Sequence, residues 1–168
     1  MKRIYVEKVT LNIGTGKPGD GLEKAVKLLK AISNHLPVKT EAKKRIPTWG
    51  LRPGLQIGTK VTLRGKEAEE LLRRLLQAKK NELKRSNFDD KGNLSFGIHE
   101  YLDIPGVKYD PGIGIIGLEV AVTLSRPGYS IKLRRVKRRS IGTRHKISKE
   151  DAIDFVVKSY GIKINEEE

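Results

Sequence analysis

Three glycines near the start of the sequence have the spacing of a dinucleotide-binding loop. Gly14, Gly16 and Gly19 spell G-x-G-x-x-G between an expected strand and an expected helix, the context in which glycines let the backbone approach a pyrophosphate. Three features oppose that reading: the strand alternates instead of being apolar throughout, Pro18 occupies the turn, and the later segment PVKTEAKK is a poor second parallel strand. The turn also lacks the Gly-Lys-Ser/Thr ending of a P-loop. A flexible glycine turn is preferred, and a small nucleotide-dependent enzyme is kept as the alternative.

The remaining reactive side chains form no recognisable catalytic or metal-binding pattern. His35, His99 and His145 are far apart without paired ligand spacing, and no Ser, His and Asp arrangement stands out. The chain has no cysteine, which excludes disulfides and thiolate metal sites. We therefore expect no catalytic residues, no metal and no cofactor.

Two stretches of the chain carry its positive charge. The formal net charge is +15. Residues 42–66 hold seven Lys or Arg side chains and residues 126–149 hold ten, and neither stretch contains an acid. Such runs are often merely solvated faces, but two acid-free runs indicate that another molecule supplies the negative charge. Phosphate is the first candidate, so nucleic acid ranks above an anionic membrane as the partner.

A membrane location is not expected from the sequence. No segment approaches the roughly 18 apolar residues needed to span a bilayer, and the amino terminus MKRIYVEKV has no apolar core of signal-peptide length. The basic runs also lack an apolar face that would support peripheral binding. We expect a soluble cytoplasmic protein without a membrane partner.

The elements that must position these side chains follow from the apolar periodicity. Alternation predicts strands, at residues 3–13, 56–64, 94–98, 118–125 and 129–134. Helical spacing predicts three helices, at residues 20–34, 66–83 and 148–160. Capping boxes are expected at Asp20 with Glu23 and at Ser148 with Asp151, and Gly161 can close the third helix.

This order of elements predicts an α+β fold. The sheet should be mainly antiparallel, with helices packed on one face and the other face open to RNA. We expect a single domain over residues 1–168, with a long basic loop at 43–58 and a short acidic tail, because no repeat or linker indicates a second domain.

Trp49, the only tryptophan, lies in the segment KKRIPTWGLRPGLQIG, which lacks helical or strand periodicity until Gln56. A loop can present an aromatic ring for stacking on a base while nearby cations hold phosphates. The alternative is that the indole packs back on its own loop. GNLSFGIHEY does not match the RNA-recognition-motif pattern, so phosphate and shape should dominate recognition.

Five segments resemble, in family order and along almost the entire chain, the 5S-rRNA-binding ribosomal protein family of the large subunit, number five in the standard naming. They are VEKVTLNIGTG, TEAKKRIPTWGLRPGLQIGTKVTLRG, FDDKGNLSFGI, IPGVKYDPGIGIIGLEVAVT and KRRSIGTRHKISKEDAI. The last is similar to the archaeal and eukaryotic branch, and the extra N-terminal helix of bacterial members is not found. The resemblance implies a noncatalytic protein of the ribosome that attaches 5S rRNA to the central protuberance.

The resemblance and the charge pattern together assign three groups of binding residues. The 5S rRNA site is expected on the open sheet face, at Lys8, Asn12, Lys60, Thr62 and Arg64. The family's P-site tRNA loop matches Lys44, Arg45, Trp49, Arg52 and Gln56. Adjacent 23S-type rRNA is expected at Arg134, Arg135, Lys137, Arg138, Arg139, Arg144, His145 and Lys146. The family also contacts protein number thirteen of the small-subunit head, which implies the same partner here without naming residues.

Overall fold

The computed structural model describes residues 1–165, so the expected acidic tail at 166–168 lies outside the described residues. The chain forms two compact units. The first unit contains Met1–Val9, Arg64–Phe96 and the chain from Ala121 onward, and the second contains Thr10–Leu63 and Gly97–Val120. Each unit is described by itself below, and the single domain expected from the sequence stays a prediction.

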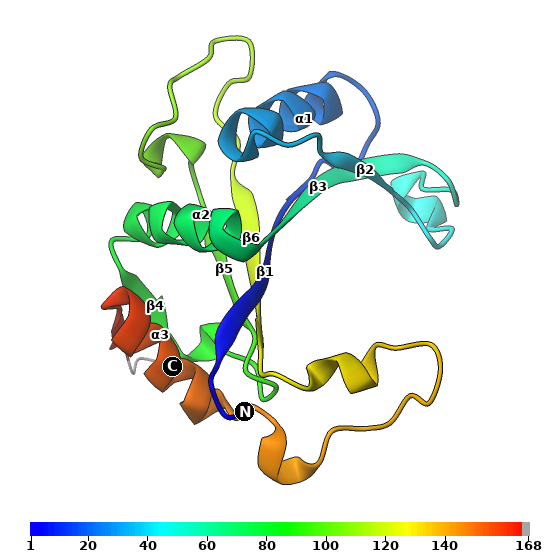
Figure 1. The fold of residues 1–168 in the computed structure, drawn as a ribbon. Coiled ribbons are helices and arrows are strands. Elements are labelled where there is room, and N and C mark those ends of the chain that lie inside the picture. The colour runs from blue at the N-terminus through cyan, green and yellow to red at the C-terminus, as the bar shows by residue number, and fades with distance from the viewer. Residues whose placement is uncertain (166–168) are drawn as a thin grey trace. The chain divides into compact units, whose positions relative to one another are not determined.

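The chain combines helices with an antiparallel sheet, which confirms the expected α+β class (Figure 1). The main sheet is antiparallel and has five strands, in the order β2 (Val38–Glu41), β3 (Gln56–Arg64), β1 (Tyr5–Gly14), β6 (Leu118–Ser125) and β5 (Leu94–Ile98). A second sheet pairs two short parallel strands, β4 (Glu82–Lys84) and β7 (Lys163–Asn165). The helices are α1 (Asp20–Ser33), α2 (Gly65–Ala78) and α3 (Lys149–Tyr160).

In the second unit, α1 buries one apolar stripe. Its buried side chains recur at helical spacing: Leu22, Ala25, Leu28, Leu29 and Ile32. Asp20 is the first helical residue and Gly19 is the N-cap, without a side-chain hydrogen bond, so the capping box expected at Asp20 is wrong. Asp20 and Glu23 still lie in the first turn, where negative charge favours the helix dipole.

In the first unit, α2 and α3 supply the helical part of the core. The buried residues of α2 are Ala68, Leu71, Leu72, Leu75 and Leu76. The capping box at the start of α3 is confirmed, because Ser148 Oγ accepts from the Asp151 N–H at 3.2 Å and the Asp151 carboxylate accepts from the Ser148 N–H at 3.3 Å. Gly161 closes α3 in the left-handed region with φ 65°, also as expected.

The sequence misplaced two segments and left a third unassigned. Helix α2 ends at Ala78, five residues before its expected end, because Lys80 and Asn81 turn the backbone to φ 56° and the next residues form β4. The expected strand at 129–134 is a 3₁₀ turn at Tyr129–Lys132, entered through Gly128 at φ 98°. Residues 38–41 form β2, which pairs antiparallel with β3. Because β3 lies between β1 and β2, the strands before and after α1 are not hydrogen-bonded neighbours, as they would be in a dinucleotide-binding β-α-β unit.

Candidate nucleic-acid interface

The strand alternation leaves one polar face of the sheet uncovered in the second unit. In β3, Lys60 and Thr62 are exposed whereas their neighbours Val61 and Leu63 are buried. Across to β1, the Thr62 and Thr10 hydroxyl oxygens lie 3.4 Å apart. Antiparallel pairing then places Asn12 beside Lys60. The face therefore carries a cation next to hydroxyl and amide groups.

Asn12 already has a partner on this face. Its Nδ2 donates to Glu119 Oε2 on β6 at 3.3 Å. This long hydrogen bond orients the amide without consuming its carbonyl oxygen, which remains an acceptor for a ribose hydroxyl.

Lys8 and Arg64 belong to the first unit. Lys8 is half-buried on β1, and Arg64 is the last residue of β3. Arg64 Nη1 lies 3.7 Å from Glu7 Oε1, with the arginine side chain 63% exposed. An ion pair this long and this exposed contributes little free energy, so the guanidinium remains available to a phosphate.

The connection between β2 and β3 is an ordered hairpin rather than an irregular loop. The Ala42 N–H donates to Leu55 O at 2.8 Å, and reciprocal backbone bonds of 3.0 and 3.1 Å join Ile46 and Leu51. Pro47–Trp49 make a single 3₁₀ turn at the tip, where Gly50 adopts φ 67°. We call residues 42–55 the tip hairpin.

Trp49 points into solvent at the end of the tip hairpin. Its side chain is 69% exposed, so it does not pack back on its own loop. Lys44, Arg45 and Arg52 are exposed on the same hairpin. Gln56, the fifth residue expected there, is instead the first residue of β3, opposite Glu41. The structure thus brings four of the five expected residues onto one hairpin.

The chain from 133 to 146, here called the basic segment, is a long excursion of the first unit. Its exposed cations are Arg134, Arg135, Lys137, Arg138, Arg139, Arg144 and Lys146. Arg134 Nε donates to Lys137 O at 2.9 Å, and the Arg139 N–H donates to Ile131 O at 3.3 Å. These bonds shape the segment while leaving most of its charge directed to solvent.

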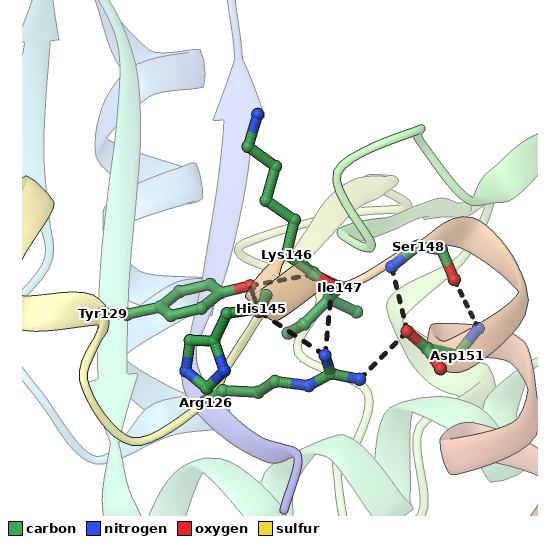
Figure 2. A network of polar contacts seen from close by, with 7 residues as sticks. All are labelled: Arg126, Tyr129, His145, Lys146, Ile147, Ser148 and Asp151. Atoms are coloured by element: carbon green, nitrogen blue, oxygen red, sulfur yellow. Dashed lines mark hydrogen bonds and ion pairs between the residues drawn. The ribbon is translucent and has the colours of Figure 1, made fainter. Parts of the chain in front are cut away.

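Arg126 differs from the other cations because it is buried, with 7% of its surface exposed. Figure 2 shows its guanidinium inside a polar network. Nη2 donates to Asp151 Oδ2 at 2.9 Å, and Nη1 donates to the carbonyl oxygens of Lys146 at 3.1 Å and His145 at 3.4 Å. Arg126 therefore ties the end of the basic segment to the start of α3.

Asp151 is held as a carboxylate at this junction. The Ser148 backbone N–H is the largest cause that lowers the pKa of Asp151 below its usual value, followed by the Ser148 hydroxyl and Arg126, while partial burial opposes them. The negative charge also lies in the first turn of α3, which suits the helix dipole.

Tyr129 fixes the same stretch from the other side (Figure 2). Its hydroxyl donates to His145 O at 3.1 Å and accepts from the Ile147 N–H at 2.8 Å. The His145 ring lies edge-on to Tyr129 at 5.7 Å, and its Nε2 contacts Pro127 O at 2.9 Å. A contact between His145 and RNA stays a prediction, and only the remaining edge of the ring could make it.

The glycine turn has no free backbone donors to offer a pyrophosphate at its start. The N–H groups of Thr15 and Gly16 both donate to Ile57 O, at 2.9 and 3.0 Å. The strand before the turn also lies in an antiparallel sheet. Both observations oppose the dinucleotide-binding alternative.

Within residues 1–165, no group of three or more His, Asp or Glu side chains is placed to hold a metal ion. No helix in this part of the chain is both long and apolar enough to cross a membrane.

A pocket of about 370 Å³ lies beside the basic segment in the first unit. Two of its lining residues, Lys91 and Lys132, were not among the expected RNA-binding residues. Lys91 was missed because it follows two acids, Asp89 and Asp90, and so belongs to no acid-free run. Lys132 was missed because the expected rRNA-binding stretch began at Arg134.

Comparison with known families matches nearly all of the described chain. Residues 1–52 match the family described as "Ribosomal protein L5", and residues 56–155 match the model that describes the C-terminus of the same ribosomal family. A protein named "Large ribosomal subunit protein uL5" from Nanoarchaeum equitans is 51% identical over 165 residues, covering 98% of this chain and 97% of that protein. The chain belongs to the uL5 family of large-subunit ribosomal proteins.

Other archaeal relatives agree. The proteins of the same name from Nitrosopumilus maritimus and Pyrobaculum aerophilum are 49% and 47% identical, each covering 98% of this chain and 95% and 92% of their own lengths. Membership makes the chain a structural constituent of the large ribosomal subunit in the cytoplasm and not an enzyme. The sequence prediction of the family is confirmed.

Proposed function

We propose that the chain binds 5S rRNA in the large subunit through the open sheet face. The observation that carries this proposal is the alternation on β1 and β3, which buries the apolar residues and leaves a cationic, hydroxyl-bearing face exposed or half-exposed. The residues proposed for this contact are Lys8, Asn12, Lys60, Thr62 and Arg64. Cations hold phosphates, and Asn and Thr can hydrogen-bond to ribose 2′-hydroxyls, which distinguish RNA from DNA.

The basic segment is proposed to hold neighbouring 23S-type rRNA. Its cations are exposed and have few intramolecular partners among the described residues, so a phosphate backbone can neutralise them with release of counterions. The residues concerned are Arg134, Arg135, Lys137, Arg138, Arg139, Arg144, His145 and Lys146.

The tip hairpin is proposed to reach P-site tRNA. Trp49 supplies a flat apolar surface for a base or ribose, while Lys44, Arg45 and Arg52 flank it on the same hairpin. Gln56 is proposed as a polar contact at the base of the hairpin. Contact with protein number thirteen of the small-subunit head is also proposed, from the family resemblance alone.

The 5S rRNA proposal is tested by binding to 5S rRNA and to a noncognate RNA across salt. If the contact engages roughly six to ten phosphates, the affinity falls by about 10³ to 10⁵ between 50 and 200 mM salt. Lys60→Gln should lower the salt slope by about 1, whereas Lys27→Gln, an exposed cation on α1 in the same unit, should not. A flat salt response, or equal effects of both variants, would remove the support for this face.

The hairpin proposal needs the assembled ribosome. Trp49→Ala combined with Arg52→Ala should leave the affinity for 5S rRNA unchanged and weaken the binding of tRNA in the P site. Loss of 5S rRNA binding in this double variant would show that the hairpin has a structural role instead.

A further inference from the structure

The pocket of about 370 Å³ beside the basic segment combines two kinds of surface. Lysines reach it from three separate parts of the first unit: Lys91, Lys132 and Lys146. Its apolar lining comes from Tyr129, Ile141 and Ile147. The size exceeds the lower limit of about 300 Å³ for small-molecule sites.

The turn that carries Lys91 is rigid. Asp89 Oδ1 accepts from the Lys91 N–H at 2.9 Å and from the Asn93 N–H at 2.6 Å, and Asp89 Oδ2 accepts from the Asn93 amide at 2.7 Å. Gly92, at φ 75°, approaches Ile147 so closely that any side chain at position 92 would collide with it. The backbone of Lys91 is therefore held beside the apolar lining.

The side of the pocket formed by Tyr129, Lys132 and Lys146 is also held by specific contacts. The Tyr129 hydroxyl is held by its two hydrogen bonds to the 145–147 stretch. Lys132 Nζ lies 4.6 Å from the centroid of the Tyr129 ring, so the ammonium group is held over the aromatic face. Lys146 is positioned by its carbonyl bond to Arg126.

We propose that this pocket receives one unstacked nucleotide of an RNA strand. A phosphate alone would not need the apolar lining, and an apolar ligand would not be met by three ammonium groups. A nucleotide combines both, with its phosphate on the lysines and its base against Ile141, since Ile147 is only 2% exposed. Asp90 and Ser140, which also line the pocket, offer acceptors to ribose hydroxyls. A base inside a duplex is stacked and cannot enter.

This inference rests on the proposed function, in which the same segment contacts ribosomal RNA. It adds that one contacted nucleotide is unpaired and is held outside its stack. It also brings Lys91, which lies outside both acid-free runs, into the interface.

The test uses the full chain with oligouridine and with a blunt RNA hairpin of the same number of phosphates. Ile141→Trp fills the pocket without changing its charge. It should lower the affinity for oligouridine by at least about fivefold, the lower end of what one bound base contributes. It should change the affinity for the RNA hairpin by less than about twofold. Lys91→Gln should also lower the affinity for oligouridine. Lys158 is an exposed cation on α3 that does not line the pocket, so Lys158→Gln should change the affinity for neither ligand.

Each other outcome has one meaning. If Lys91→Gln weakens both ligands equally and Ile141→Trp weakens neither, the lysines supply only diffuse charge and the pocket proposal fails, while 5S rRNA binding by the parent chain still supports the proposed function. If uridine monophosphate binds as tightly as oligouridine, the ligand is a free nucleotide and not an RNA strand. Because Lys91 is exposed, its variant should fold and decide the question even if Ile141→Trp does not fold.

Discussion

Replacing Arg126 should destabilise the protein without removing a contact to RNA. Arg126→Met keeps most of the aliphatic length and deletes the guanidinium, which removes its hydrogen bonds to Lys146 O, His145 O and Asp151. His145 O keeps the Tyr129 hydroxyl and Asp151 keeps the Ser148 N–H as donors. Hydrogen bonds to a charged group contribute about 1.5 to 3 kcal/mol when the site is buried.

Two features of the site limit this loss. The Asp151 side chain is 44% exposed, so its ion pair contributes about 1 kcal/mol or less. Arg126 Nε is buried and finds no hydrogen-bond partner among the described residues, so its removal relieves a desolvation cost. We expect the free energy of unfolding to fall by about 2 to 3 kcal/mol. Arg126→Lys should recover less than half, because one ammonium group cannot reach both sides of the network.

Urea titration followed by far-UV circular dichroism measures this loss. The matched cation is Arg138, which is exposed in the same acid-free run. Arg138→Gln should leave the unfolding midpoint unchanged and lower the salt slope of rRNA binding by about 1. Arg126→Met should lower the unfolding midpoint and leave the salt slope unchanged. The reasoning is refuted if Arg126→Met costs under about 0.5 kcal/mol and lowers the salt slope, because Arg126 would then act on RNA.

Three further predictions follow from single contacts. Because the pKa of Asp151 is lowered in the folded state, its contribution to stability is present above pH 3.8 and is lost as the pH falls through the folded-state pKa. Urea midpoints measured across that pH range should decline less in Asp151→Asn. Gly58→Ala places a methyl group 2.9 Å from both Ile13 O and Thr40 Oγ1 and should lower stability by about 1 to 3 kcal/mol by thermal unfolding; an unchanged melting temperature would contradict this packing. Trp49→Ala should change stability by less than about 0.5 kcal/mol, because the side chain is 69% exposed; a larger loss would mean that the indole is packed.

The sequence predicted those parts of the interface that depend on local periodicity. Alternation between Val61 and Thr62 is enough to assign the faces of β3, and the Ser148 capping box identifies the start of α3 because the two residues that form it are three apart. The same segment, which has no periodicity and contains several glycines and prolines, predicted a loop position for Trp49 but left open whether the indole packs back, and the structure shows it 69% exposed.

What the sequence could not predict depends on residues that are distant along the chain. Tyr129 belongs to an alternating pattern, yet its hydroxyl bonds to a stretch 16 and 18 residues away and the backbone turns accordingly. In the sequence Arg126 looks like one more cation of a basic run. Its hydrogen bond to Asp151, 25 residues later, forms only when the chain folds. Lys91 joins the pocket because Gly92 packs on Ile147, a contact that no charge count reveals.

The position of the single tryptophan makes its fluorescence a probe of binding at the tip hairpin. Because the indole is 69% exposed at the tip hairpin, we expect its fluorescence to resemble that of the unfolded chain and to change little during denaturation. Quenching or a blue shift on adding a ligand would instead show that something has covered the tip. Emission therefore follows occupancy of this one end of the molecule, while tyrosine signals or circular dichroism must be used to follow folding.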